Sequence, residues 1–335
     1  MRIMVAGGAG FLGSHLSRAL LGSGHDVVCV DDLSTGSRAS IADLLEHPSY
    51  EFVRTDVAHA PSLPVDVIAH LASPASPIDY DRMPVHTMRA NSLGTFRLLE
   101  VADQVGAALV FVSTSEVYGD PLVHPQPEEY WGNVDPVGPR SCYDESKRFG
   151  EALLFATRRE TGVRANVVRL FNTYGPAMRR DDGRVVPEMI SAALAGRPLV
   201  IHGDGRQTRS FCYVSDLVDG LRHVVLDPEL DGAIFNIGNP AEITMRELAE
   251  CIVELTGGHG ELRFTGPRPG DPERRRPVIR RMQERYGWEP RVELRDGLSR
   301  TIQAFREAEA AATSGSPPRR TQAATAPIPD VVGAA

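Results

Sequence analysis

The sequence of 335 residues has few cysteines, few aromatic residues and no long apolar run. None of its four cysteines has the C-x-x-C spacing of a zinc site or a redox motif. We therefore expect reduced thiols, no bound metal ion and a cytoplasmic location. No apolar run approaches the roughly 18 residues needed to cross a membrane, and the chain enters a folded motif within its first residues, so we expect neither a membrane span nor a signal peptide.

Basic residues are also in deficit. Lysine and arginine total 36 against 44 acidic residues, which gives a formal net charge of −8. This charge argues against non-specific nucleic-acid binding, which usually needs a basic face. A small anionic ligand stays compatible with it, because a local group of arginines can override the net charge.

Apolar runs alternate with segments of helical spacing in the first half of the chain. RIMVAGG, FLGSHLSRALLGSG and DVVCVDD predict a strand, a helix and a second strand within one unit of about 30 residues. The pattern predicts an α/β fold with a doubly wound parallel sheet of the Rossmann type. We expect an NAD-binding domain over 1–171, a smaller and partly interleaved nucleotide-sugar region over 172–307, and a disordered tail over 308–335.

The turn after the first strand has the composition of a dinucleotide-binding loop. Gly7, Gly10 and Gly13 allow the backbone to approach a pyrophosphate at the start of the first helix. Asp31 ends the second strand, 24 residues after Gly7. Its carboxylate can accept both hydroxyls of the adenosine ribose and would repel a 2′-phosphate, so the pattern favours NAD over NADP. Arg38 weakens this preference slightly, and Asp32 is the less suitable neighbour.

Further cofactor contacts are expected around this turn and after two other strands. Asp56 can accept from the adenine amine, although a helix N-cap is an equally good interpretation. We also assign Phe11, Leu12 and Leu71 to the cofactor site, the last because the segment HLASPASP follows the fourth strand.

A catalytic group is predicted where the strand ALVFV ends. Thr114 follows this strand, and Tyr143 and Lys147 lie four residues apart on the next predicted helix. A tyrosine and a lysine at this spacing are often just a solvated surface pair. Beside a predicted NAD site, however, they indicate hydride transfer, with Tyr143 removing a hydroxyl proton and Lys147 lowering its pKa and binding the nicotinamide ribose.

At these residues the chain resembles a known family. GGAGFLG, STSEVYG and YDESK are similar to the extended short-chain dehydrogenase/reductases, which act on nucleotide sugars. SEVYGDPLVHPQPEEYWGNVDPVGPRSCYDESKR, FNTYGP, DDGRVVPEMI and GDGRQTRSFCYVSDLVDGL resemble the UDP-glucuronate decarboxylases (UDP-xylose synthases) over roughly residues 1–306. Two positions depart from that family's pattern: Ser146 stands for a glycine and Ser73 for a cysteine.

The resemblance implies UDP-glucuronate as the substrate, which is oxidised at C4, loses CO₂ and is reduced again, with NAD recycled. It assigns catalysis to Thr114, Glu116, Tyr143, Lys147 and Arg275. It assigns substrate binding to Ser115, Asn172, Arg184, Arg209 and Arg275. Arg275 belongs to a run of three arginines, so Arg274 or Arg276 can also be the contact. The resemblance places Arg184 before a helix that faces the uracil, and Tyr174 fits either core packing or a substrate contact.

Several alternatives stay open. A nucleotide-sugar 4-epimerase shares Thr114, Tyr143 and Lys147. A 4,6-dehydratase is less favoured, because that family has an aspartate where this chain has Ser115. A decarboxylase that releases the 4-keto pentose uses the same residues, and a non-catalytic NAD-dependent sensor or scaffold is possible on this fold.

The resemblance also implies a homodimer. The segments 87–105 and 143–161 are each expected to form one long helix with two apolar faces. One face would cover the sheet, and the other would pair across a two-fold axis.

Overall fold

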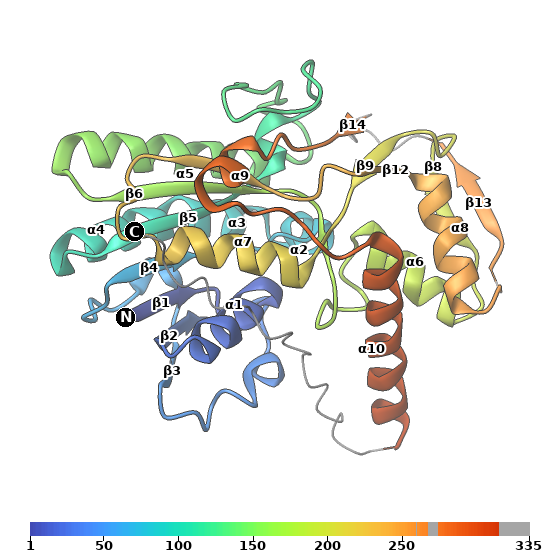
Figure 1. The fold of residues 1–335 in the computed structure, drawn as a ribbon, viewed down its shortest axis with the longest axis horizontal. Coiled ribbons are helices and arrows are strands. Elements are labelled where there is room, and N and C mark those ends of the chain that lie inside the picture. The colour runs from blue at the N-terminus through green and yellow to red at the C-terminus, as the bar shows by residue number, and fades with distance from the viewer. Residues whose placement is uncertain (259, 267–273, 315–335) are drawn as a thin grey trace.

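The computed structural model describes residues 1–258, 260–266 and 274–314, and a seven-stranded parallel sheet lies at its centre (Figure 1). In spatial order the strands are β11 (Ile234–Ile237), β6 (Ala165–Leu170), β5 (Ala108–Thr114), β4 (Val67–His70), β1 (Arg2–Ala6), β2 (Asp26–Asp31) and β3 (Tyr50–Arg54). The chain leaves β1 toward β2 and then returns to β4 on the other side. The predicted doubly wound sheet is therefore confirmed, with its switch point between β1 and β4.

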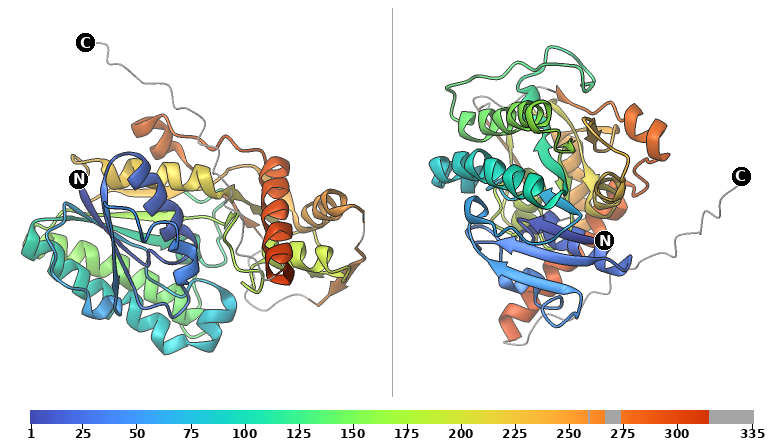
Figure 2. Two further views of the ribbon diagram at one scale, coloured as in Figure 1. Left: turned by 90° about the horizontal axis from the view of Figure 1, so that it is seen from below. Right: turned by 90° about the vertical axis from the view of Figure 1, so that its left-hand side faces the viewer.

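Helices cover both faces of this sheet (Figure 2). On one face lie α1 (Phe11–Gly22) and α7 (Val214–Leu226), and on the other lie α4 (Leu93–Val105) and α5 (Ser141–Thr161). The strands between them are buried on both sides; every residue of β5 is buried, for example. Continuous apolar runs such as ALVFV are the signature of strands in this position.

The segment 87–105 is not one helix, so that expectation was wrong. α3 (Pro84–Asn91) ends and α4 begins on either side of Ser92. Where the two helices meet, the carbonyl of Met88 accepts from both the hydroxyl and the backbone nitrogen of Ser92, at 2.6 and 2.9 Å. The side-chain contact is thus added to the backbone hydrogen bond. The short α2 (Pro77–Arg82) precedes α3. In contrast, the expected helix at 143–161 is present within α5.

The second region lies beyond the carboxyl ends of the strands, on the right in Figure 1. Its elements are β7 (Thr173–Tyr174), α6 (Val185–Leu194), β8 (Leu199–His202), β9 (Thr208–Ser210), β10 (Cys212–Tyr213), β12 (Glu242–Thr244), α8 (Met245–Thr256), β13 (Leu262–Thr265), β14 (Arg274–Arg275) and α10 (Leu294–Ser314). The short α9 (Arg280–Tyr286), between β14 and α10, packs instead against β11 of the first region. Between β10 and β12 the chain returns to the first region, where α7 and β11 complete the central sheet. The two regions are thus interleaved, while the boundary at 171/172 stays a prediction.

The expected disordered tail begins too early. α10 continues to Ser314, so the expectation is wrong for residues 308–314. These residues include a run of alanines, which have the highest helix propensity, and they precede the first glycine and proline of the tail. Residues 315–335 lie outside the described part of the chain.

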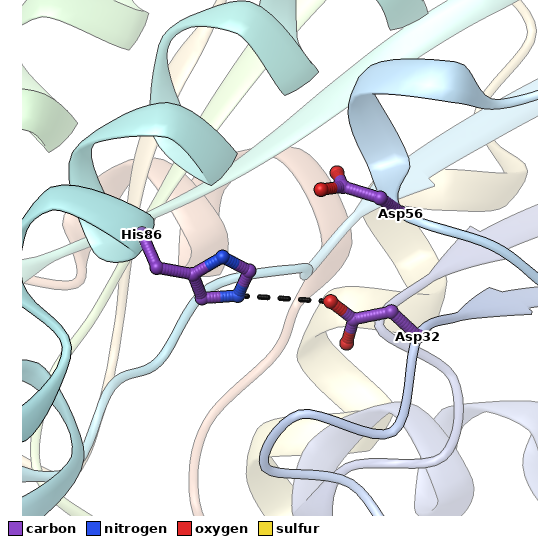
Figure 3. Close-up of side chains that lie close together, drawn as sticks. All are labelled: Asp32, Asp56 and His86. Atoms are coloured by element: carbon purple, nitrogen blue, oxygen red, sulfur yellow. Dashed lines mark ion pairs between the residues drawn. The ribbon is translucent and has the colours of Figure 1, made fainter.

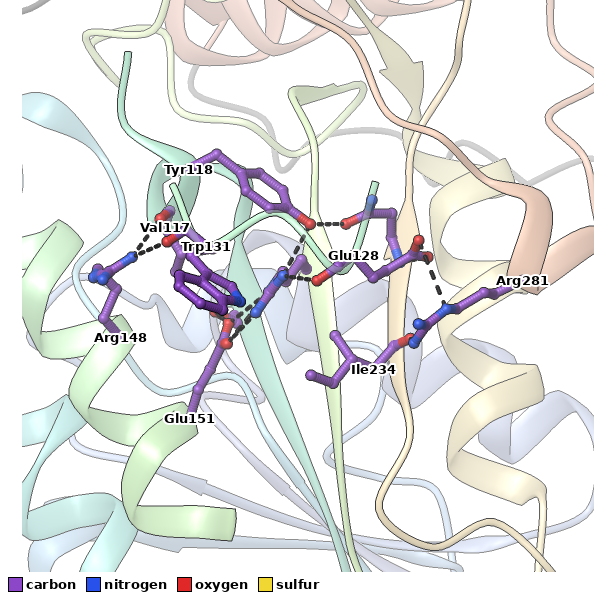
Figure 4. A network of polar contacts seen from close by, with 11 residues as sticks. Val117, Tyr118, Glu128, Trp131, Arg148, Glu151, Ile234 and Arg281 are labelled. Atoms are coloured by element: carbon purple, nitrogen blue, oxygen red, sulfur yellow. Dashed lines mark hydrogen bonds and ion pairs between the residues drawn. The ribbon is translucent and has the colours of Figure 1, made fainter. Parts of the chain in front are cut away.

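A cluster of buried charges joins the sheet to the loop that follows β5 (Figure 4). Arg169 on β6 donates to both carboxylate oxygens of Glu151, to the Tyr118 hydroxyl at 3.0 Å and to the Glu128 carbonyl at 2.9 Å. Ser113, at the end of β5, donates to the same Glu151 at 2.6 Å. We call this group the Arg169 cluster. Every nitrogen of its guanidinium donates a hydrogen bond, so the buried charge is well compensated.

All four cysteines are free thiols, and three of them are buried. In the described ranges, no helix is both long enough and apolar enough to cross a membrane.

Candidate active site

A cavity of about 790 Å³ runs along the carboxyl ends of the central strands and continues into the second region. Every residue that the sequence analysis assigned to catalysis, cofactor binding or substrate binding lines it. Ligands in open α/β sheets bind at this position, outside the switch point. The structure therefore brings the candidate residues together, although their individual roles stay predictions.

The glycine-rich turn between β1 and α1 leaves room only for backbone. Gly7 has a φ of +82°, and a Cβ there would lie 2.6 Å from the nitrogen of Ala72. A Cβ on Gly13 would lie 2.1 Å from the carbonyl oxygen of Gly7. Both positions therefore require glycine. The turn brings the N-terminus of α1 to the cavity wall, as a pyrophosphate site requires.

Asp31 is held in place at the end of β2. One of its carboxylate oxygens accepts from the backbone nitrogen of Ala9 at 2.9 Å, and the other accepts from that of Leu33 at 2.8 Å. Burial raises the pKa of this carboxyl, and the two backbone hydrogen bonds oppose that shift. Asp31 thus lines the cavity in a fixed orientation, which fits the predicted ribose contact.

Three polar side chains meet near this end of the cavity (Figure 3). Asp32, Asp56 and His86 present ligand atoms within 4.8 Å of one another, and the imidazole of His86 lies 3.6 Å from Asp32. Asp56 accepts from the backbone nitrogen of Ala58 at 2.9 Å and so caps the short helix η2 (Val57–His59). The N-cap interpretation of Asp56 is therefore correct, and the same residue also lines the cavity.

Tyr143 and Lys147 both point from α5 toward the end of β5. The ring of Tyr143 stacks on that of Tyr80 at 5.4 Å, and its hydroxyl is hydrogen-bonded with Thr114. The ammonium group of Lys147 donates to the carbonyl of Val112 at 2.8 Å. The two side chains and Thr114 therefore share one site, as predicted.

The expected effect of Lys147 on Tyr143 is wrong for this arrangement. Burial raises the pKa of Tyr143, and the hydrogen bond with Thr114 and the charge of Arg184 only partly oppose it. Burial also lowers the pKa of Lys147 to about 7, against the opposing influence of Glu151. Lys147 is thus only partly charged at neutral pH, and its ammonium group is directed at a backbone carbonyl.

Glu116 is held between two arginines at the start of the short helix η3 (Ser115–Tyr118). Arg275 donates to one of its carboxylate oxygens, and Arg140 donates to the other. Arg140 also lies 3.9 Å from the carboxylate of Asp144. We call these four residues the Glu116 cluster. Glu116, Arg140 and Arg275 line the cavity.

The two carboxylates of this cluster differ in their acidity. Burial by itself raises the pKa of Glu116, but Arg275 and Arg140 outweigh it and lower the value to about 2. Burial and the charge of Glu116 raise the pKa of Asp144 to about 7. Glu116 is therefore a permanent carboxylate at neutral pH, whereas Asp144 exchanges its proton in that range.

The structure distinguishes among the three consecutive arginines. Arg275 is 3% exposed and faces Glu116, whereas Arg274 is exposed and Arg276 lies 3.6 Å from Glu242. β14 runs parallel to β9, and Arg275 lies opposite Arg209 in that pairing. The two arginines thus reach the cavity from adjacent strands.

The remaining substrate candidates differ in how they are held. Asn172 donates to the carbonyl of Ser210 at 3.3 Å, and Arg209 donates to that of Thr208 at 2.8 Å. The positive charge of Arg184 acts on Tyr143, so Arg184 lies near the predicted base. It is the N-cap residue of α6, the helix that the resemblance assigns to the uracil, and that role stays a prediction. Tyr174 is fully buried and donates to the carbonyl of Leu294 at 3.2 Å, which makes it a core residue.

The sequence analysis missed Arg140 and Asp144. Arg140 is the N-cap residue of α5, and Asp144 lies in its first turn, four residues later. The sequence could have indicated this pair, because charged residues at positions i and i+4 of a helix lie on one face, and this helix also carries Tyr143. The contact of Arg140 with Glu116 had no such signal, since it joins separate elements.

The two departures from the family pattern meet at one residue. The side-chain amide of Asn91, at the end of α3, donates to the hydroxyls of both Ser73 and Ser146, each at 3.0 Å. Ser73 lies in the loop after β4, and Ser146 lies on α5 beside Lys147. The two serines therefore join the loop after β4 to α5 through one amide.

Comparison with protein families gives one match that covers most of the chain. The profile described as "NAD dependent epimerase/dehydratase family" matches residues 3–238. UDP-glucuronic acid decarboxylase 3 of Arabidopsis thaliana is 50% identical over 307 residues, which cover 91% of this chain and 89% of that protein. UDP-glucuronic acid decarboxylase 1 of Xenopus tropicalis is 47% identical over 306 residues, which cover 91% of this chain and 72% of that protein.

Solved structures show the same architecture. UDP-glucuronic acid 4-epimerase from Bacillus cereus, in complex with UDP-glucuronic acid and NAD, superimposes with a TM-score of 0.84 at 27% identity. The match covers 92% of this chain and all of that one.

Proposed function

The chain belongs to the NAD dependent epimerase/dehydratase family, and on that premise we propose that it is an NAD-dependent UDP-glucuronate decarboxylase that forms UDP-xylose and CO₂. The observation that carries the proposal is the Glu116 cluster. It adds a carboxylate and two arginines to the Thr114–Tyr143–Lys147 group at the same end of the cavity. Oxidation at C4 needs only the latter group, so the additional charges support a further step at the neighbouring carbons. The relatives named decarboxylases support the same reaction.

The residues present fit NAD. The turn at Gly7 and Gly13 has no room for a Cβ and presents backbone at the start of α1, and the Asp31 carboxylate is oriented at the cavity wall. These residues would hold the pyrophosphate and the adenosine ribose, Asp56 the adenine, and Lys147 the nicotinamide ribose. When bound, NAD supplies the oxidation at sugar C4 and the later reduction at the same carbon.

Tyr143 acts on the proton of the C4 hydroxyl in this proposal. Thr114 hydrogen-bonds that hydroxyl and Tyr143 together. Because burial raises the pKa of Tyr143, the phenol needs a nearby positive charge to release its proton, and the charge of Arg184 acts on it in this sense. After the C4 ketone is made, the C6 carboxylate lies β to it, and loss of CO₂ leaves an enolate.

Protonation of C5 is assigned to the Glu116 cluster. With a pKa of about 2, Glu116 is a poor proton donor at neutral pH. Its carboxylate and the two arginines are better suited to hold a water molecule that delivers the proton. The sequence allowed Glu116 either to transfer a proton to C5 itself or to position a water there. Because Glu116 is ionised, we favour the second role.

The competing functions make different products. An epimerase would convert UDP-glucuronate to UDP-galacturonate, a shorter decarboxylase reaction would release the 4-keto pentose, and a sensor would form nothing. Incubating the protein with UDP-glucuronate and NAD⁺ and identifying the products separates all four possibilities.

The decisive variant is Tyr143→Phe, which keeps the ring stack on Tyr80 but removes the hydroxyl. We expect turnover to fall by at least ~10²-fold, the scale of a lost general base, while NAD binding is retained. Near-normal turnover would remove Tyr143 from the mechanism. Asp31→Ala is the matched cofactor variant, and it should weaken NAD binding more than UDP binding.

The proposal includes a homodimer in the cytoplasm. Apolar side chains on α3, α4 and α5 are exposed, among them Val85 at 68%, Phe96 at 46% and Phe149 at 45%. The rings of Phe96 and Phe149 lie 6.2 Å apart, so they form one surface. Burying it against a second copy would complete a four-helix arrangement despite the break at Ser92. Light scattering at micromolar concentration tests this, and a monomer would contradict it. The free thiols support the proposed compartment.

A further inference from the structure

The Glu116 cluster brings two arginines to the wall of the cavity. Arg140 and Arg275 each donate to one oxygen of Glu116. Asp144, the other carboxylate, lies 3.9 Å from Arg140 and does not line the cavity. Within the cavity wall, two guanidinium groups thus face one carboxylate. A guanidinium group at the cavity wall is well suited to bind the carboxylate of a ligand.

The sugar of UDP-glucuronate has such a group close to this position. Its C6 carboxylate is attached to C5, which is bonded to C4. If Thr114 and Tyr143 hold the C4 hydroxyl, the carboxylate lies within a few ångströms of them. Glu116 follows Thr114 by two residues, and its backbone nitrogen donates to the Thr114 hydroxyl oxygen at 3.2 Å. The Glu116 cluster is therefore adjacent to the place where the carboxylate would lie.

We propose that Arg140 is a specificity-determining residue that orients the C6 carboxylate of the sugar. The inference rests on the proposed function. Arg140 suits this role better than Arg275, because the side chain of Arg275 is 4% exposed and also donates to the carbonyl of Gly119 at 3.4 Å. The side chain of Arg140 is 26% exposed and extends from the first residue before α5. It can turn toward a ligand without disturbing a strand.

The shared position of Arg140 also matches the chemistry of decarboxylation. A strong ion pair would stabilise the carboxylate before the reaction and so raise the barrier to its loss as CO₂. Arg140 already lies between Glu116 and Asp144, so a third carboxylate receives only part of its charge. The sugar is oriented, but it is not held so tightly that CO₂ cannot leave.

Binding of two nucleotide sugars tests the proposal. UDP-glucuronate carries the carboxylate and UDP-xylose lacks it, and both can be titrated by calorimetry into NAD-loaded protein with the Tyr143→Phe change, which prevents turnover. Arg140→Gln should weaken UDP-glucuronate binding by about 10-fold, the scale of one charge-assisted hydrogen bond. UDP-xylose binding should change by less than about twofold, and Arg140→Lys should give an intermediate preference.

The matched control is Arg276→Gln, which removes the same charge from a residue that pairs with Glu242 at 3.6 Å. It should leave the preference for UDP-glucuronate over UDP-xylose unchanged. Equal weakening of both ligands by Arg140→Gln, or an unchanged preference, would overturn the inference. If Arg140→Gln does not fold, the Arg140→Lys preference decides: a value equal to that of the parent protein also overturns it.

Failure of the proposed function would appear elsewhere. The chain without any substitution would then release no CO₂ from UDP-glucuronate. If it does release CO₂ while Arg140→Gln keeps the parent preference, only the role of Arg140 is wrong.

Discussion

Two clusters of buried arginine and glutamate begin within three residues of each other at the end of β5, and they are built in opposite ways. The Arg169 cluster starts from Ser113, and all three nitrogens of its guanidinium donate to protein oxygens. The Glu116 cluster contains the buried Asp144 Oδ1 and Arg275 Nε, neither of which has a hydrogen-bond partner. The first cluster joins structural elements, and the second faces the cavity.

The difference separates two kinds of buried charge, one that holds the structure together and one that can bind a ligand. A fully bonded charge fixes the position of its neighbours, and the protein gains little by moving it. A charge with polar atoms left over is costly in an empty site, and a ligand can relieve that cost. Burial alone would rank the two clusters together, whereas their hydrogen bonding distinguishes the cluster that faces the cavity from the one that does not.

The largest effect should come from breaking the saturated cluster. Arg169→Met leaves the carboxylate of Glu151 buried without its cation, and we expect the free energy of unfolding to fall by about 3–5 kcal/mol. Urea unfolding measures this change. The double variant Arg169→Met with Glu151→Leu is the control, and it should recover much of the loss because no unpaired charge remains. A single variant as stable as the parent would mean that the cluster contributes nothing to stability.

Breaking the cavity cluster should affect catalysis instead. Glu116→Gln keeps the shape of the side chain but removes its charge, and we expect release of UDP-xylose to fall by about 10²-fold. Bound NADH should still form in a single turnover, because Tyr143 and Thr114 are unchanged. Absorbance of NADH, followed together with labelled CO₂, separates the two steps. Decarboxylation at the parent rate would show that Glu116 is structural.

Lys147 belongs to neither cluster and sharpens the comparison, because burying its ammonium group has a cost in stability. Since burial lowers its pKa from 10.5 to about 7, the unfolded chain binds more protons between these values, and stability rises with pH across that window. Lys147→Met should raise the unfolding free energy at neutral pH by about 1–2 kcal/mol and abolish turnover. Thermal unfolding measured from pH 7 to pH 10 should show the stability difference between the variant and the parent protein becoming smaller as the pH rises. A constant difference would contradict the assignment.

The smallest effect should come from the neutral contact of Asn91, which has no charge to lose. Ser73→Ala and Ser146→Ala should each lower the unfolding free energy by about 0.5–1.5 kcal/mol, the net value of one hydrogen bond. The double variant should differ from the sum, because both hydroxyls accept from one amide. Strict additivity in chemical unfolding would show that the two contacts are independent.

The sequence predicted the parts of the site that follow from local pattern. Gly7, Asp31, Thr114 and Tyr143 each stand at a strand end or on the helix that follows one, and the parallel sheet brings such positions to one edge. The resemblance added Arg275, which is 159 positions from Glu116 along the chain. Without it, three consecutive arginines gave no indication of which one was buried.

The remaining features depended on tertiary contacts. The raised pKa of Tyr143 follows from burial that no four-residue spacing reveals, and Arg169 occurs within an apolar strand whose polar partners come from separate elements. The break at Ser92 had no counterpart in the apolar pattern of the segment 87–105. Local propensity cannot predict such choices, because the competing interactions differ by about 1 kcal/mol.

The pairing of β9 with β14 fixes the distance between the backbones of Arg209 and Arg275. Arg209 and Arg275 occupy one rung of a parallel ladder, and neighbouring strands lie about 4.8 Å apart. If one arginine binds the diphosphate and the other binds the sugar, the backbone pairing fixes the distance between the diphosphate site and the sugar site. A nucleotide sugar with one phosphate fewer, or with a longer linkage to its sugar, would reach one of the two arginines but not the other. The enzyme would then select nucleotide sugars first by the distance between their diphosphate and their sugar, and only then by the hydroxyl groups of the sugar.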